Sequence, residues 1–100
     1  MKSLVETIKE TVPTLIVFQH AGEKDAVEVN REIEELRAKY GSRANIISVD
    51  ASHNGSYKVE YKIKEYPAYI LFKEGQELMR ESGKKSIAKL EDMLTRAGVA

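Results

Sequence analysis

Residues 14–18 have the sequence TLIVF, and this stretch sets the expected fold. It is short, apolar and rich in β-branched residues, which is typical of a strand that is covered on both faces of a sheet. A second apolar segment, ANIISVD at residues 44–50, follows after one helix-length stretch. A helix between two such strands is the signature of a right-handed crossover, so we expect the two strands to be parallel.

The segment from about Glu23 to Tyr40 has the periodicity of an amphipathic helix. Apolar residues recur every three or four positions and therefore share one face: Ala26, Val29, Ile33, Leu36 and Tyr40. The first turn is acidic, the last turn is basic, and Gly41 follows as a helix terminator.

The outer segments predict shorter elements. Ser3 can cap a short helix with Leu4, Val5 and Ile8 on one side, and Pro13 would stop that helix. Residues 57–63 indicate a short helix or an irregular segment. Residues 68–80 predict an antiparallel hairpin that turns at Glu74-Gly75. A last helix should begin after Ser86 and bury Ile87, Leu90, Leu94 and Ala97.

The expected order of elements is therefore α-β-α-β-α-β-β-α. A chain of 100 residues suits one core, so we expect residues 1–100 to form a single domain. The fold class is α/β, with three layers: a mixed sheet and helices on both of its faces.

Composition excludes several functions. Sixteen Lys and Arg residues balance sixteen Asp and Glu residues, and the charges are interspersed, so nothing favours nucleic acid or an anionic membrane as a partner. The chain has no Cys, which removes disulfides, thiolate nucleophiles and cysteine-ligated metals. No segment is apolar and long enough to cross a membrane or to act as a signal sequence, so we expect a cytoplasmic protein.

Three polar residues near the start of the long helix suggest a metal or acid–base site, namely His20, Glu23 and Asp25. A short loop does not impose the geometry of a ligand set, and both acids already suit the positive end of the helix. We therefore expect dipole complementation, with no metal, no cofactor and no catalytic residue. His53 is expected to be a turn histidine.

Four tyrosines could instead form a stacking platform for bases, with lysines nearby: Tyr57, Tyr61, Tyr66 and Tyr69. Packing explains Tyr61 and Tyr69 better, because stacking surfaces normally come with a net positive charge. We expect no nucleic acid to bind here.

The order of the expected elements, together with several local sequences, resembles the thioredoxin family from about Ser3 to Gly98. TLIVF resembles the strand before the family's active-site helix, and Val49-Asp50 resembles the end of the next strand. Residues 61–83 resemble the family's stretch that contains its cis-proline, its hairpin glycine and a groove glycine. The resemblance places Pro67, Gly75 and Gly83 at these three positions, and implies a thioredoxin-like four-stranded sheet that lacks the family's N-terminal edge strand.

The departures from the family pattern decide the chemistry. Glu23 and Ala26 occupy the two cysteine positions, Gly22 replaces the tryptophan, and Val17 replaces the buried aspartate. Disulfide exchange proceeds by thiolate attack, which no carboxylate or methyl group can perform. A dithiol oxidoreductase is therefore excluded.

The resemblance also implies a binding groove, which does not depend on the cysteines. In the family, backbone groups beside the cis-proline pair with an extended substrate segment, which is a short form of strand addition. The implied groove residues are Gly22, Glu23, Ala26, Tyr66, Pro67 and Gly83. We expect a redox-inactive domain that binds a protein or an extended peptide, or acts as a chaperone-like module. The alternatives are a glutathione or thiol-ligand-binding activity and a structural domain of a larger assembly, and the groove could equally be a remnant of the fold.

The missing edge strand has a further implication. Residues Ala44 to Val49 would form an edge strand, and an open apolar edge is a template for another chain. A homodimer through this edge is one hypothesis, and a protected edge on a monomer is the other.

Overall fold

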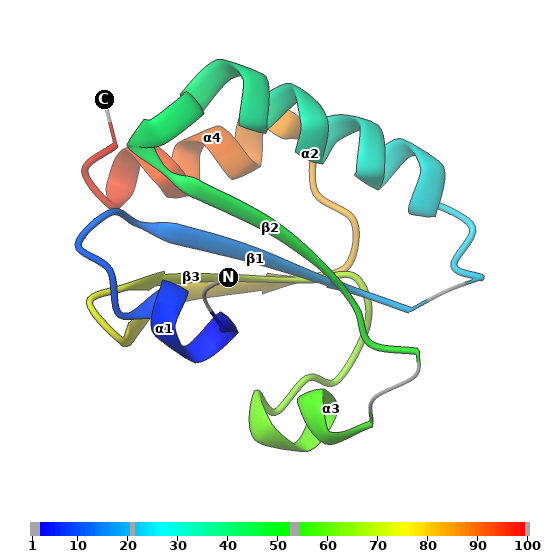
Figure 1. The fold of residues 1–100 in the computed structure, drawn as a ribbon. Helices are drawn as coiled ribbons and strands as arrows, with labels where there is room; N and C mark the ends of the chain where they lie inside the picture. The colour runs from blue at the N-terminus through cyan, green and yellow to red at the C-terminus, as the bar shows by residue number, and fades with distance from the viewer. Residues whose placement is uncertain (1–2, 21, 53–54, 100) are drawn as a thin grey trace.

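The computed structural model describes residues 3–20, 22–52 and 55–99, and within these ranges the chain forms a four-stranded sheet between two layers of helices (Figure 1). The strand order is β2-β1-β3-β4, with β1 at Thr14–Gln19, β2 at Asn45–Asp50, β3 at Ala68–Lys73 and β4 at Gln76–Ser82. β1 runs parallel to β2 and antiparallel to β3, and β3 and β4 form an antiparallel hairpin. The expected mixed sheet is confirmed.

β1 pairs with a strand on each side, and every residue in it is buried. Leu15, Ile16, Val17 and Phe18 each have no exposed surface, so side chains on both faces of the strand are covered. Leu15 and Val17 point into one cluster of buried residues, and Ile16 and Phe18 point into another on the opposite face. This alternation follows from the two-residue period of a strand.

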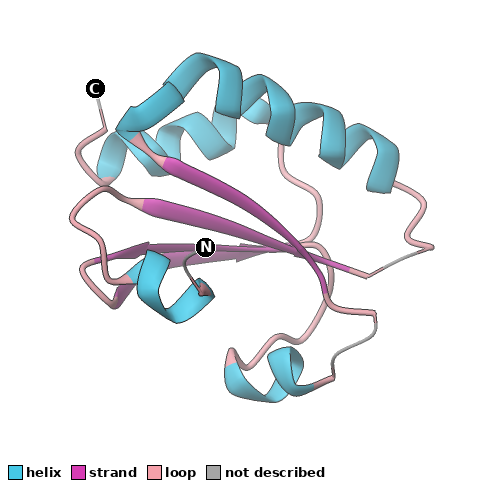
Figure 2. Ribbon diagram, viewed as in Figure 1, coloured by secondary structure: helices cyan, strands magenta, loops and turns pink. Residues whose placement is uncertain are grey.

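Two long helices cover one face of the sheet, which we call the α2–α4 face (Figure 2). α2 spans Ala26–Tyr40 and α4 spans Ile87–Arg96. Their apolar residues pack with β1 and β3 as one core, which includes Val29, Ile33 and Leu36 of α2 and Leu90 and Leu94 of α4. Ser86 caps α4, since its side chain accepts a hydrogen bond from Lys89 N at 3.2 Å.

Two short helices cover the opposite face, which we call the α1–α3 face. α1 spans Leu4–Ile8 and α3 spans Ser56–Glu60. Aromatic rings fill the space under them: Phe18 lies 5.7 Å from Tyr57 and 5.0 Å from Tyr61, between ring centroids. Tyr61 also meets Phe72 edge to face.

The sequence expectation for the end of α1 was wrong. The helix already ends at Ile8, so Pro13 is not what stops it. Val5 is 46% exposed, and only Leu4 and Ile8 pack against the core.

The hairpin turn holds α1 in place. Glu74 and Gly75 both have positive φ, of 53° and 83°, as the two central residues of a tight hairpin turn with right-handed twist require. Their backbone N–H groups donate to Glu10 O at 3.0 Å and to Ile8 O at 2.7 Å. The end of α1 is thus bonded to the β3–β4 turn.

β2 is less buried than its sequence suggested. Ile46 is buried, but Ile47, Ser48 and Val49 are only partly buried and Asp50 is exposed. The reason is its position, because within the described residues no strand pairs with its outer edge.

Over the same residues, no helix is long and apolar enough to cross a membrane.

Candidate functional site

The sheet topology brings three separate segments together at one end of the molecule. Because β1 and β3 are antiparallel, with Phe18 opposite Ala68, the end of β1 lies beside the residues just before β3. The start of α2 and the loop after β4 reach the same place. A cavity of about 60 Å³ lies there, which we call the first cavity, lined by Gln19, Glu23, Asp25, Ala26, Val29, Tyr66, Pro67 and Lys84.

Four of the six expected groove residues line the first cavity: Glu23, Ala26, Tyr66 and Pro67. The other two do not. Gly22 is exposed with a φ of 92°. Gly83 lies against the same segment, because its N–H donates to Pro67 O at 2.9 Å. Its φ of 79° favours glycine, and a Cβ there would come within 3.2 Å of Glu65 Oε1.

Tyr66 is the aromatic residue of this site. The Tyr66–Pro67 peptide bond is cis, and the Tyr66 side chain is half-buried. Within the described chain, neither the backbone N–H nor the backbone C=O of Tyr66 has a hydrogen-bond partner. Its ring lies 5.6 Å from the His20 ring, between centroids. An unpaired donor and acceptor thus lie beside an aromatic ring, which an extended peptide can use.

The acids at the start of α2 do not combine with His20 into one site. Glu23 and Asp25 line the first cavity, whereas His20 lines a separate cavity described below. Asp25 precedes the helix without forming a capping hydrogen bond through its side chain. Among the described residues, no group of three His, Asp or Glu side chains is placed to hold a metal ion. The two acids remain suited to the positive end of the helix dipole.

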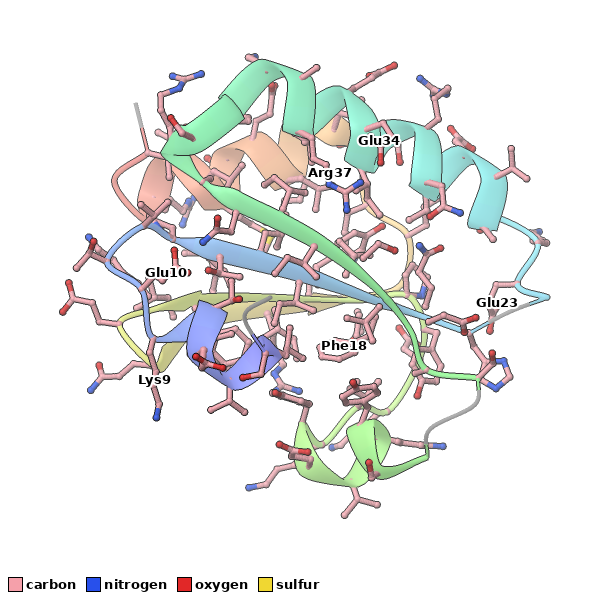
Figure 3. All side chains as sticks on the ribbon, in the orientation of Figure 1. Lys9, Glu10, Phe18, Glu23, Glu34 and Arg37 are labelled. Atoms are coloured by element: carbon pink, nitrogen blue, oxygen red, sulfur yellow. The ribbon has the colours of Figure 1, made fainter. Side chains whose placement is uncertain are left out.

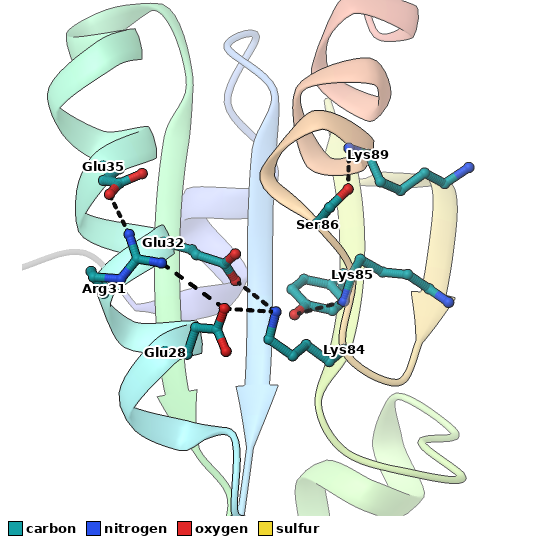
Figure 4. A network of polar contacts seen from close by, with 9 residues as sticks. Glu28, Arg31, Glu32, Glu35, Lys84, Lys85, Ser86 and Lys89 are labelled. Atoms are coloured by element: carbon teal, nitrogen blue, oxygen red, sulfur yellow. Dashed lines mark hydrogen bonds and ion pairs between the residues drawn. The ribbon is translucent and has the colours of Figure 1, made fainter.

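Lys84, Glu28 and Glu32 form a charged group beside the first cavity (Figure 4). This group was not identified from the sequence. Lys84 Nζ lies 3.4 Å from Glu28 Oε1 and 3.6 Å from Glu32 Oε1. Glu32 is only 6% exposed, and its Oε1 has no hydrogen-bond partner among the described residues. Partial burial lowers the pKa of Lys84, but Glu32 and Glu28 outweigh it, so the pKa lies above its usual value.

Tyr69 lies beside this charged group and is fully buried. Burial raises the pKa of its hydroxyl, although the N–H of Lys85 donates to the oxygen at 3.4 Å and opposes the rise. Tyr69 therefore serves as a packing residue, as its sequence position suggested. Tyr57 and Tyr61 pack around Phe18 on the opposite face of the sheet, so the four tyrosines do not form one stacking surface.

A second cavity of about 220 Å³ is lined by Gln19, His20, Ala26, Asn30, Ser48 and Asp50. Gln19 lines both cavities and is only 8% exposed. Its Nε2 donates to Asn30 Oδ1 at 2.8 Å and to Ser48 Oγ at 3.1 Å, which fixes the side chain between α2 and β2. The sequence did not single out Gln19, because a polar residue directly after an apolar strand normally begins a loop.

Comparison with known proteins identifies the family. The thioredoxin family model matches residues 28–96, and on this evidence the chain belongs to the thioredoxin family. It is 33% identical over 63 residues to thioredoxin from Staphylococcus aureus. This match covers 60% of the present chain and 61% of the relative, so it spans less than two thirds of the relative's length.

Solved structures give the same fold. The chain matches a designed protein with a TM-score of 0.85 and 25% identity, over 97% of this chain and 86% of that one. It also matches a mutant thioredoxin from Halobacterium salinarum with a TM-score of 0.84 and 17% identity, over 94% of this chain and 81% of that one. The second likeness shows the fold alone. The fold is that of thioredoxin, and the absence of Cys is consistent with redox inactivity.

Proposed function

We propose that this thioredoxin-family domain binds an extended protein or peptide segment in the candidate groove, without redox chemistry. By the candidate groove we mean the first cavity together with Gly22 and Gly83. The observation that carries the proposal is Tyr66, whose backbone N–H and C=O have no partner within the described chain. An unpaired backbone donor and acceptor at an accessible position can form two hydrogen bonds with a passing strand.

The surroundings of Tyr66 support the same function. The first cavity, of about 60 Å³, suits one side chain of a ligand whose backbone stays on the surface. The aromatic body of Tyr66 offers apolar contact next to polar groups, a combination that is enriched in protein interfaces. Val27, in the first turn of α2, is 86% exposed and extends the apolar contact area near this end of the helix.

The test is a peptide selection followed by mapping. Random peptides displayed on phage are selected against the immobilised chain, and a synthetic peptide from the winners is titrated into labelled protein and followed by NMR. We expect the largest amide shifts at Glu23, Ala26, Tyr66 and Gly83. The double variant Glu23→Arg with Tyr66→Ala should weaken binding at least about tenfold, which corresponds to about 1.4 kcal/mol.

The matched control is Glu60→Arg, which makes the same change of charge on α3, away from the candidate groove. It should bind like the wild type. Equal loss in both variants would show a general charge effect. Shifts confined to another surface, or no selected peptide at all, would contradict the proposal and leave the candidate groove as a remnant of the fold.

Glutathione binding is the alternative to a protein ligand, because it also needs open backbone groups beside the proline. A titration with glutathione up to millimolar concentration separates the two. Shifts at Tyr66 and Gly83 with glutathione, and none with peptides, would favour the alternative. A third possibility, a structural role in a larger assembly, predicts that neither ligand binds.

A further inference from the structure

The outer edge of β2 carries a self-pairing surface, and the orientation of its backbone can be read from two hydrogen bonds. Asn45 N donates to Pro13 O at 2.9 Å, and Ala51 N donates to Gln19 O at 2.7 Å, so the odd-numbered residues face β1. Backbone groups alternate in direction along a strand. Ile46, Ser48 and Asp50 therefore direct their N–H and C=O groups away from β1, toward the open edge.

The side chain of Arg37 lies at this edge. Arg37 extends from α2 toward β2 (Figure 3), and its Nε donates to Ile46 O at 2.9 Å. The guanidinium group also pairs with Glu34 one turn earlier, which holds it in this position. The sequence showed only a basic residue in the last turn of the helix, and a solvated position would have been the ordinary expectation. Arg37 instead donates to a carbonyl oxygen that an added strand would need.

The other end of the edge leads into a local turn. Asp50 Oδ1 accepts hydrogen bonds from Ser52 N at 2.9 Å and from Ser52 Oγ at 2.6 Å. This turn ends the strand immediately after Asp50. The edge strand is therefore short and centred on Ser48, and a short edge strand is a common defence against pairing.

We propose that the β2 edge is a docking surface for a second copy of this chain, and that Arg37 keeps it closed in the free protein. An antiparallel pair about a two-fold axis at Ser48 is self-complementary. It places Ser48 opposite Ser48 and Ile46 opposite Asp50, so the outward-facing backbone groups of the two copies point toward one another. In this register Asp50 N of the second copy points at Ile46 O, and Arg37 already donates a hydrogen bond to that oxygen.

The side chains of β2 also favour pairing with a second copy of the chain. In this register Ile47 lies opposite Val49 of the second copy, twice, on the α1–α3 face of the sheet. Both residues are only partly buried and already pack against the apolar cluster on that face. Pairing would extend one apolar surface across both copies, and opposed β-branched residues stabilise antiparallel pairs.

The test compares Arg37→Ala with Arg31→Ala by sedimentation equilibrium, from a few micromolar to several hundred micromolar protein. Arg31 is the matched control, because it lies on the same helix and pairs with Glu35 at 2.5 Å and with Glu28. We expect wild type and Arg31→Ala to stay monomeric and Arg37→Ala to approach twice the monomer mass. Amide exchange at Ile46 and Ser48 should slow as the Arg37→Ala dimer forms.

A second pair of variants locates the contact. The Ser48 N–H faces outward, so Ser48→Pro removes no hydrogen bond to β1 but blocks an added strand. Added to Arg37→Ala, Ser48→Pro should restore the monomer. Ser48→Ala, which also loses the bond from Gln19 but keeps the N–H, should not. Arg37→Met, which retains the apolar stem, repeats the test should the alanine variant unfold.

Three results would overturn the proposal. A folded Arg37→Ala that stays monomeric at the highest concentration would show that the edge does not accept a second copy. Equal dimerisation of wild type and Arg37→Ala would remove the closing role of Arg37. A dimer that Ser48→Pro does not affect would place the contact on another surface. None of these results bears on peptide binding in the candidate groove.

Discussion

The α2–α4 face of the sheet is covered by helices of 15 and 10 residues, whereas the α1–α3 face is covered by two helices of five residues each. The first face is filled mainly by aliphatic side chains from helices that each contribute several buried residues. On the second face, the aromatic rings of Phe18, Tyr61 and Phe72 fill the space, and neither short helix has a fully buried residue.

This difference shows two ways to cover a sheet. A helix of five residues cannot form alone, because the cost of nucleation exceeds what so few hydrogen bonds return. α1 depends instead on tertiary bonds to the β3–β4 turn and on its capping box, and α3 depends on Tyr57 and Tyr61 packing around Phe18. We therefore expect the α1–α3 face to open locally before the α2–α4 face does.

The largest loss of stability should come from truncating a core side chain on either face of the sheet. Phe72→Ala should cost about 3–5 kcal/mol and Leu36→Ala about 2–5 kcal/mol of the free energy of unfolding, measured by urea denaturation. Both side chains are at most 5% exposed. Leu78, which is 43% exposed, is the matched control, and Leu78→Ala should stay within about 0.5 kcal/mol. A Phe72→Ala loss below about 1 kcal/mol would mean that the aromatic face adds little to global stability.

Native-state hydrogen exchange sharpens this comparison. Amides of α1 and α3 should exchange at a free energy well below that of global unfolding, and buried amides of α2 should exchange only by global unfolding. Equal protection of both layers would show that the short helices unfold together with the rest of the domain.

The next effect concerns the charged group on the α2–α4 face. Lys84→Met should cost about 1–3 kcal/mol, because it leaves the buried carboxylate of Glu32 without its nearby cation. The double variant Glu32→Leu with Lys84→Met should recover most of this loss, since an apolar pair avoids burying a charge. A single variant as stable as the wild type would indicate that Glu32 reaches solvent.

A smaller effect should separate the two helix caps. Ser86→Ala removes the side-chain cap of α4 and should cost about 1 kcal/mol in urea denaturation. Ser3→Ala removes the corresponding bond to Glu6 N, at 3.1 Å, from the shorter helix. It should cost less globally, because α1 can open while the rest stays folded. Equal losses would contradict independent opening of α1.

Much of the fold could be predicted because its elements carry strong local signals. The mainly apolar TLIVF predicts a strand, the three- and four-residue spacing of residues 26–40 predicts a helix, and Glu74-Gly75 predicts a hairpin turn. The structure contains all three. The partial burial of β2 could not be read from its sequence, because an apolar strand looks the same at the centre and at the edge of a sheet. The end of α1 at Ile8 was missed because a tertiary contact, not Pro13, stops it.

The candidate site was predictable only where the family resemblance supplied positions. Glu23, Ala26, Tyr66 and Pro67 line the first cavity, whereas Gln19 and Lys84 were missed. Gln19 owes its burial to partners on α2 and β2, far away in sequence, and Lys84 owes its position to two acids of α2. Long-range polar contacts of this kind leave no local pattern. The one hint in the local sequence was Glu32, because an acid on the apolar side of a helix indicates that a polar partner lies nearby.

The smallest expected effect is a pH dependence on the α1–α3 face. Arg80 projects to this face, where it bonds to Glu77 at 2.7 Å and to Lys62 O at 3.3 Å, which ties β4 to the segment after α3. The bond from Arg80 holds the pKa of Glu77 below its ordinary value of 4.5. The pair therefore stabilises the fold above about pH 4.5, and this contribution is lost as the pH falls through the lowered pKa.

Because both side chains are about one third exposed, screening by solvent should keep the contribution below about 0.5 kcal/mol. In urea denaturation at pH 7, the free energy of unfolding of Glu77→Gln should be lower than that of wild type by less than about 0.5 kcal/mol. The two free energies should become equal well below pH 4.5. The matched control is Glu34→Gln, on the opposite face, which should not change exchange rates after α3. If the pair anchors the α1–α3 face, amides near Ile63 should exchange faster in Glu77→Gln at pH 7. Unchanged exchange there would assign the anchoring of α3 to the aromatic rings alone.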